Sequence, residues 1–279
     1  MAQLDDEHWR MPTNARPAIE TPKKQIKLWL PNGPSKNLAK RLGHRFVRPA
    51  LRRLESWRRV TYGNIRVHYK DYLDGGGRGF GQDYVPFLHD LRMPEQARVF
   101  EWCAGPGFIG FSLLGYGLCE TLCLADVNPD AVQACRRTIA DNKLANRVSV
   151  YCSDNLDSIP SSERWDLVVG NPPHFDSRPF GSEKRFADLG WNTHRRFFQS
   201  IDRFLNPGGV ILIQECNCGS TVETFRTMIG DAGLSIVLTH GCEPRLTPYN
   251  RIYYLGIMRQ GEAPPEWLLA GASEDSVGT

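Results

Sequence analysis

The chain has 279 residues, of which 41% are apolar and 23% charged, and its formal net charge is +3. This length predicts one full-sized domain with a smaller extension. No apolar run reaches the roughly 18 residues that a bilayer-spanning helix requires, and the first residues lack the basic and apolar regions of a secretory signal. We therefore expect a cytoplasmic protein with no membrane partner.

The positive charge is concentrated at the N-terminus. Residues 1–60 contain 14 Lys and Arg against 5 Asp and Glu, a balance of +9, whereas the remainder, with 20 against 26, carries −6. We predict a basic extension over residues 1–59, poorly ordered at first and then an amphipathic helix from about residue 36 that Pro49 divides. Such an arm is typical of a nucleic-acid or ribosomal contact, and equally of a solvated helix that packs on the domain.

Residues 60–96 are predicted to form a substrate-side segment. Residues 60–69 alternate like a strand or hairpin, and residues 74–81 include five glycines, which predicts a loop able to act as a lid. An ordinary surface loop is the alternative. The candidate substrate-binding residues of this segment are Tyr72, Phe80, Gln82 and Tyr84.

From residue 97 onward, strands and helices alternate. Strands are predicted at 98–103, 121–125, 147–152, 165–170 and 210–214, then at 235–239 and 252–258, with helices to about 118 and at 129–143, 191–204 and 221–232. This order predicts an α/β fold, a Rossmann-like, doubly wound and mainly parallel sheet over residues 97–260, with a flexible tail at 261–279. Ligands of such sheets bind beyond the carboxyl ends of the strands.

The eight cysteines are scattered through apolar stretches and lack the short paired spacings of zinc sites. We interpret them as reduced core thiols and predict no metal site.

A glycine-rich loop follows the first strand of this domain. Gly105, Gly107 and Gly110 have a spacing that fits both a dinucleotide and a methyl-donor site. Glu101, at the strand end, can accept from the amino group of an amino-acid cofactor, which a dinucleotide lacks. Asp126 is placed to bind a ribose, and Asp154 can accept from an adenine amine. Alternatively, Glu101 is an ordinary strand-end carboxylate, Asp126 caps a helix and Asp154 is a turn residue. The predicted cofactor-binding set is Glu101, Cys103, Ala104, Gly105, Gly107, Asp126, Val127, Asp154, Asn155 and Asn171.

The strand at 165–170 ends in Asn171-Pro172-Pro173-His174. The two prolines make this turn stiff, because each fixes its own φ and disfavours helix at the residue before it. The Asn171 side-chain oxygen and the Pro172 carbonyl can then accept both hydrogens of a planar amino group. Such acceptors stabilise the positive charge that develops on nitrogen as a methyl group arrives. Asn171, Pro172 and His174 are the candidate catalytic residues.

Together the glycine loop, the three acids and the Asn171 turn resemble class I S-adenosylmethionine-dependent methyltransferases over roughly residues 60–260. The resemblance is to the branch with an Asn-Pro-Pro-aromatic motif, which includes the release-factor and ribosomal-protein glutamine methyltransferases and the adenine amino-methyltransferases of RNA and DNA. It implies seven strands with the last, residues 252–258, antiparallel. It also implies S-adenosyl-L-methionine as cofactor, S-adenosyl-L-homocysteine as product, and methylation of a planar nitrogen.

His174 departs from this pattern, because the branch has an aromatic residue there. An imidazole can stack on a flat substrate group or shuttle a proton, and a purely structural turn residue is the alternative. Phe175 can supply a stacking face. Trp191 and His194, three residues apart on one helix face, complete the predicted substrate-binding set, with core packing as the alternative for both.

The sequence leaves the methyl acceptor open. It is compatible with a protein glutamine or ribosomal component, with an RNA adenine, and with a small amine or guanidine. Another S-adenosylmethionine-consuming reaction of a biosynthetic pathway and an NAD-dependent oxidoreductase are the remaining alternatives.

Overall fold

The computed structural model describes residues 55–75, 77–177, 186–241 and 252–269. The expectations for residues 1–54, which cover nearly all of the basic extension, lie outside the described residues. In the described ranges, no helix is long and apolar enough to cross a membrane.

The centre of the fold is a seven-stranded sheet with the order β5-β4-β3-β6-β7-β9-β8. Its strands are β3 (Gln96–Trp102), β4 (Cys119–Asp126), β5 (Val148–Cys152), β6 (Trp165–Gly170), β7 (Leu205–Cys216), β8 (Leu234–His240) and β9 (Ile252–Arg259). The strands from β5 to β7 pair in parallel, whereas β9 runs antiparallel to both of its neighbours, β7 and β8. The predicted Rossmann-like sheet with an antiparallel last strand is confirmed.

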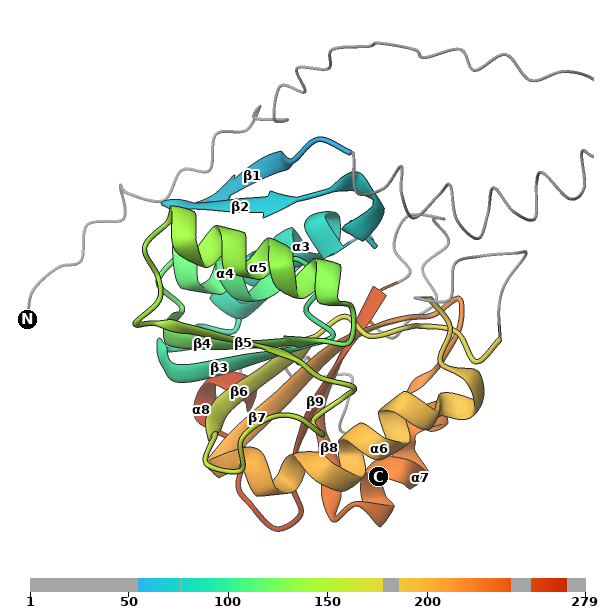
Figure 1. The fold of residues 1–279 in the computed structure, drawn as a ribbon. Helices are drawn as coiled ribbons and strands as arrows, with labels where there is room; N and C mark the ends of the chain where they lie inside the picture. The colour runs from blue at the N-terminus through green and yellow to red at the C-terminus, as the bar shows by residue number, and fades with distance from the viewer. Residues whose placement is uncertain (1–54, 76, 178–185, 242–251, 270–279) are drawn as a thin grey trace, which may run out of the picture. The chain divides into compact units, whose positions relative to one another are not determined.

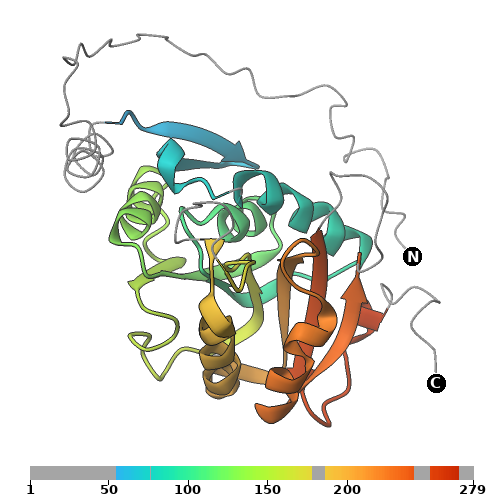
Figure 2. The ribbon, with the colours of Figure 1, turned by 90° about the vertical axis from the view of Figure 1, so that its right-hand side faces the viewer.

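Helices cover both faces of this sheet. Figure 1 shows α3 (Gly77–Asp90), α4 (Phe108–Gly115) and α5 (Pro129–Asp141) over one face, and α6 (Asn192–Ile201) and α7 (Val222–Asp231) over the other. The view turned by 90° places the same helices on the same two sides (Figure 2). Parallel strands buried on both faces are nearly continuous apolar runs, and in β6 the run is the fully buried Leu167-Val168-Val169.

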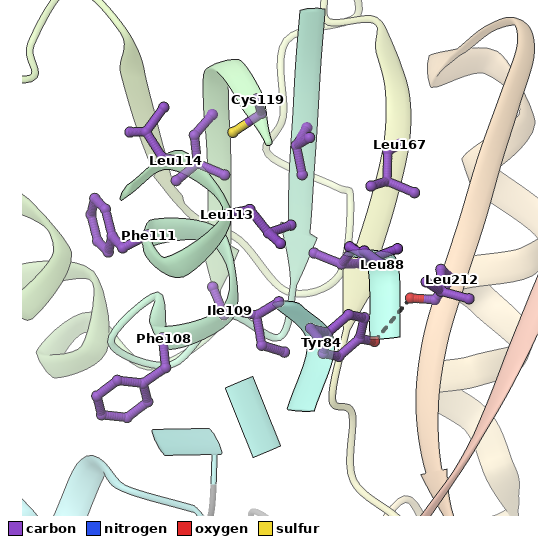
Figure 3. Packing of buried hydrophobic residues seen from close by; sticks show 14 of the residues in the cluster. Tyr84, Leu88, Phe108, Ile109, Phe111, Leu113, Leu114, Cys119, Leu167 and Leu212 are labelled. Carbon is purple, nitrogen blue, oxygen red and sulfur yellow. Dashed lines mark hydrogen bonds between the residues drawn. The ribbon is translucent and has the colours of Figure 1, made fainter. Parts of the chain in front are cut away.

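The core is divided by the sheet because neighbouring side chains of a strand point to opposite faces. In β6, Leu167 and Val169 belong to the apolar cluster under α3 and α4, whereas Val168 belongs to the cluster under α6 and α7. Figure 3 shows the first cluster, in which the α4 side chains and Tyr84 of α3 pack against strand residues such as Leu167.

The segment before β3 differs in part from the sequence prediction. The expected hairpin is present as β1 (Arg58–Tyr62) and β2 (Ile65–Tyr69), which pair antiparallel. The glycine-rich residues, however, do not form a loop throughout, because α3 begins at Gly77. Burial of Tyr84 and Leu88 against the sheet outweighs the roughly 1 kcal/mol that each glycine costs a helix. A long glycine lid is therefore not what this segment forms.

The end of the described chain also packs more closely than expected. Residues 261–269, which we had assigned to a flexible tail, include the short helix α8 (Glu266–Leu269), and Leu268 is buried in the core. The cysteines Cys119, Cys123 and Cys135 are buried thiols, whereas the Cys152 and Cys218 side chains are exposed. Cys242 lies outside the described residues.

Candidate functional site

The carboxyl ends of β3, β4, β5, β6 and β7 lie along one edge of the sheet, because these strands are parallel neighbours. The candidate cofactor-binding and catalytic residues lie at or just after these strand ends.

Glu101, on β3, is a buried carboxylate that holds the start of α4. Its two oxygens accept from the backbone N–H groups of Ile109 at 3.2 Å and Gly110 at 2.7 Å. Burial raises the pKa of Glu101 to about 8, and the two amide donors lower it by less. A Cβ on Gly110 would lie 2.8 Å from Glu101 Oε2, so the glycine permits this cap. The orphan amides of a helix start favour an anion there.

The glycine loop is tied to the end of β4. Cys103, Gly105 and Gly107 have φ of 53°, 53° and 80°, a left-handed backbone that glycine adopts without strain. The Gly105 N–H donates to Asp126 Oδ2 at 2.7 Å, and the other oxygen of Asp126 accepts from Asn128 N–H at 2.8 Å. Burial is the largest cause of the raised pKa of Asp126. Asp126 thus fixes the loop at the end of β4, and ribose binding by its carboxylate stays a prediction.

Two further predicted positions follow the ends of β4 and β5. Val127 is an apolar side chain that is 65% exposed. Asp154 is exposed and pairs with Arg196 at 3.2 Å, so an adenine amine would compete with this arginine for the carboxylate. Asn155 donates from its side chain to Thr193 O at 2.8 Å, while its Oδ1 is buried without a hydrogen-bond partner in the described part of the chain.

The Asn171 turn is supported from beneath by Tyr84. The Tyr84 hydroxyl lies 2.8 Å from Gly170 O and 2.9 Å from Leu212 O, and Figure 3 draws the second of these bonds. Tyr84 is fully buried, so its position is that of a core residue and not of the substrate contact we expected. Pro172 is buried as well, and Asn171 Oδ1 is a buried oxygen with no partner among the described residues.

Behind this turn lies a row of four ionisable side chains. His174 Nδ1 is 3.1 Å from Glu215 Oε2, Glu215 Oε1 is 2.9 Å from His194 Nε2, and His194 Nδ1 is 2.7 Å from Asp188 Oδ2. We call these residues the His–Glu–His–Asp row. Glu215, His194 and Asp188 have side chains at most 2% exposed.

The charges in this row follow from its geometry. Burial lowers the pKa of His194, but the two carboxylates outweigh it and raise that pKa to about 9. Burial raises the pKa values of Glu215 and Asp188, but hydrogen bonds and charge from the histidines outweigh it and lower both. His194 is therefore a buried imidazolium between two carboxylates. The Trp102, Trp191 and Phe225 rings lie around it, with centroids 4.8–5.3 Å away, which favours a cation.

The loop after β7 closes on the same turn. A Cβ on Gly219 would lie 1.9 Å from His174 O, so only glycine lets this loop approach the His174 backbone. Gly219 and Ser220 both donate to Cys216 O, which keeps the loop tight against the turn.

The remaining residues that we predicted to bind substrate lie in different parts of the fold. Tyr72 donates to Asp130 Oδ2 at 2.9 Å, at the start of α5. Phe175 lies next to the turn and pairs with the segment at Ala187. Trp191 contacts His194, as their spacing predicted, but Trp191 caps α6 in a left-handed conformation. Phe80 and Gln82 lie in α3, and their side chains are outside the described part.

Glu215 was not among the predicted site residues. His194 is 0% exposed and lies between two carboxylates, so of the two roles predicted for it the buried one is found, and it supports His174 through Glu215. The available signal was Gln214-Glu215, two polar residues at the end of the apolar strand β7, which lies next to β6.

Comparison with known proteins is consistent with this site. Residues 85–227 match the methyltransferase small domain family. A release factor glutamine methyltransferase of Clostridium acetobutylicum is 29% identical over 138 residues, 44% of this chain and 48% of that protein. A ribosomal RNA large subunit methyltransferase I of Citrobacter koseri is 24% identical over 155 residues, 53% of this chain and 37% of that protein. The match therefore spans half or less of each relative.

Among solved structures, a 16S rRNA N2 G1207 methyltransferase of T. thermophilus, in complex with AdoMet and guanosine, has a TM-score of 0.50 at 14% identity. It covers 73% of this chain and 50% of that chain, and the likeness is one of fold. Because the family match takes in β3 to β7 with the glycine loop and the Asn171 turn, the chain belongs to the methyltransferase small domain family.

Proposed function

We propose that this protein is an S-adenosylmethionine-dependent methyltransferase that methylates a planar nitrogen, such as a glutamine amide or an adenine amine. The observation that carries the proposal is Asn171 Oδ1, a buried acceptor with no partner in the described ranges. A buried polar atom without a hydrogen bond costs about 1–3 kcal/mol. An N–H donor from a substrate removes that cost, so the turn is suited to a substrate amino group.

The residues at the strand ends fit the proposed cofactor. The buried Glu101 carboxylate suits the ammonium of a methionine moiety, Asp126 suits a ribose, and the exposed Val127 offers an apolar face to a flat base. The left-handed glycine loop lets a ligand approach the backbone. The occupied Asp154 is the weakest part of this fit, since Arg196 already pairs with it.

When bound, S-adenosylmethionine supplies an electrophilic methyl group on a positively charged sulfur. The protein's part is to position the acceptor nitrogen and to stabilise the positive charge that grows on it. Asn171 Oδ1 does both, because accepting an N–H bond orients the amino group and strengthens as the nitrogen becomes cationic. Tyr84 and the two prolines keep that oxygen in place.

The acceptor is proposed from the same geometry. An amide or ring-conjugated amine has a delocalised lone pair and benefits most from a fixed acceptor, which favours glutamine or adenine over a free aliphatic amine. The names of the relatives, a release factor glutamine methyltransferase and an rRNA methyltransferase, support a protein or RNA acceptor. The +9 charge of residues 1–60 supports docking on nucleic acid or a ribosomal surface.

Two measurements test this proposal. In calorimetry, the protein should bind S-adenosylhomocysteine and not NAD, and tight NAD binding alone would overturn the proposal in favour of an oxidoreductase. With methyl-labelled S-adenosylmethionine and cell extract, label should enter macromolecules. Parallel digestion with nuclease and with protease then names the acceptor class, and label confined to small molecules would contradict a macromolecular acceptor.

A further inference from the structure

The His–Glu–His–Asp row gives His174 a fixed protonation geometry. Glu215 is ionised and accepts from His194 through one oxygen and from His174 through the other. A carboxylate has no proton to donate, so Nδ1 of His174 must carry the proton of their bond. In neutral His174, Nε2 is then an unprotonated acceptor. Nε2 has no hydrogen-bond partner among the residues the structure describes.

The net charge of the His–Glu–His–Asp row favours the binding of one more proton. Asp188 and Glu215 carry two negative charges and His194 one positive charge, so the row has a net charge of −1 while His174 is neutral. A proton on His174 Nε2 would bring the row to neutrality, with Glu215 in contact with the new imidazolium. Buried carboxylates 0–2% exposed are little screened by solvent.

From this arrangement we propose that His174 is the proton acceptor of the reaction and that Glu215, His194 and Asp188 are its positioning residues. This inference rests on the proposed function. The acceptor nitrogen uses its lone pair to form a bond to the methyl carbon, and the electron pair of the breaking carbon–sulfur bond stays on sulfur. The nitrogen then releases one N–H proton to His174 Nε2, and the proton leaves to solvent after product departs.

Groups on neighbouring elements do not compete for this role. The Cys103 thiol, from the loop after β3, lies within electrostatic range of Asp188 and Glu215, and the Tyr84 hydroxyl, from α3, lies within range of Glu215. Burial above all raises the pKa of both groups well beyond the ordinary range. Each therefore keeps its own proton near neutral pH and cannot accept another one, whereas the Nδ1–H bond to Glu215 leaves Nε2 of His174 as an open acceptor.

The first part of the test needs no acceptor substrate. In full-length protein with ¹⁵N-labelled histidine, each signal is assigned by its disappearance in a variant. The wild-type imidazole signal that disappears in His194→Gln should show a proton on both nitrogens up to about pH 8. The imidazole signal that disappears in His174→Phe should, in its neutral form, carry its proton on Nδ1. A neutral His194, or a His174 with its proton on Nε2, would overturn the inference.

The second part uses tritiated S-adenosylmethionine with gel-filtered cell extract as the acceptor. His174→Phe keeps a flat ring but should lower the rate of label uptake about 100-fold, the usual scale of general base catalysis, and should remove the loss of rate at acid pH. Glu215→Gln should lower the maximal rate and leave the KM for S-adenosylmethionine unchanged.

Asp141→Asn is the matched control, because Asp141 pairs with His68 at 3.0 Å in a histidine–carboxylate pair outside this row. It should leave the rate and its pH profile unchanged. A wild-type rate and profile in His174→Phe would overturn the proton-acceptor role while leaving methyl transfer intact. If the wild-type protein transfers no label, the proposed function itself is wrong and the proton-acceptor role falls with it, whatever the ¹⁵N spectra show.

Discussion

Replacing His194 with Gln removes the cation between two buried carboxylates, and the structure sets the size and the pH dependence of the effect. The pKa of His194 rises from 6.5 to about 9 on folding. Each pKa unit is worth about 1.4 kcal/mol, so the charged His194 contributes roughly 3 kcal/mol to the free energy of unfolding. Removing one member of a buried ion pair costs about 3–5 kcal/mol, which agrees in scale.

The sign follows from the raised pKa. The contribution is fully present below pH 6.5, where His194 is protonated in both states, and is lost as pH rises through about 9. The difference in unfolding free energy between wild type and His194→Gln should therefore shrink by roughly 3 kcal/mol over this window. Glu101, with a pKa of about 8, also weakens the fold as pH rises, but it is present in both proteins and cancels in the difference.

Urea unfolding followed by circular dichroism at several pH values between 6 and 9.5 measures this difference. A difference that does not change with pH would refute the charged state assigned to His194. Should His194→Gln fail to fold, the wild-type protein compared with Asp188→Asn provides the same test, because that variant removes one of the two charges that stabilise the imidazolium.

Three further predictions follow from single contacts. Gly219→Ala should displace the turn at His174, because the added Cβ would lie 1.9 Å from the His174 carbonyl oxygen, and should lower both turnover and melting temperature. As the control, Gly230→Ala lies in a helix where the added Cβ would meet no atom within 4 Å, and it should stabilise the protein. Tyr84→Phe leaves the carbonyls of Gly170, at the end of β6, and of Leu212, within β7, without this donor. It should cost about 1–3 kcal/mol in urea unfolding, and an unchanged stability would contradict the supporting role. Glu101, with a pKa of about 8, is protonated at pH 7, so binding of S-adenosylhomocysteine should release a proton and become tighter as pH rises toward 8. Calorimetry in buffers of different ionisation enthalpy detects this proton. A binding enthalpy that does not depend on the buffer would speak against a contact between Glu101 and the ligand's amino group.

The sheet could be predicted because each of its strands is indicated by residues that are close together in the sequence. Each strand from β3 to β7 is an apolar run followed by glycine, asparagine or aspartate, and this order alone specifies a parallel sheet with its ligand edge at the strand ends. The hairpin at residues 58–69 was equally readable from its alternation. The helix at Gly77 was not, since five glycines predict a loop and only the burial of Tyr84 and Leu88 against the sheet reverses that preference.

The site was predictable where one motif contains its residues. The Asn171 turn and the glycine loop each lie within a few residues of sequence. The His–Glu–His–Asp row was not predictable, because His174 and Glu215 are 41 positions apart and only the parallel pairing of β6 with β7 brings them together. Tyr84 was assigned to the substrate for the same reason, since nothing in its sequence neighbours reveals that its hydroxyl reaches carbonyls of two strands, Gly170 of β6 and Leu212 of β7.

Methyl transfer to nitrogen through Asn171 is tested most directly by comparing wild type with Asn171→Ala in two measurements on the same preparations. We expect wild type to transfer label from S-adenosylmethionine to nitrogen of a macromolecule, recovered as an N-methyl group after hydrolysis. Asn171→Ala should bind S-adenosylhomocysteine with unchanged affinity while transfer falls on the order of 100-fold or more, as for removal of one preorganised group at a charged transition state. An Asn171→Ala protein that transfers methyl at the wild-type rate, or label recovered on carbon or oxygen, would contradict methyl transfer to nitrogen through Asn171.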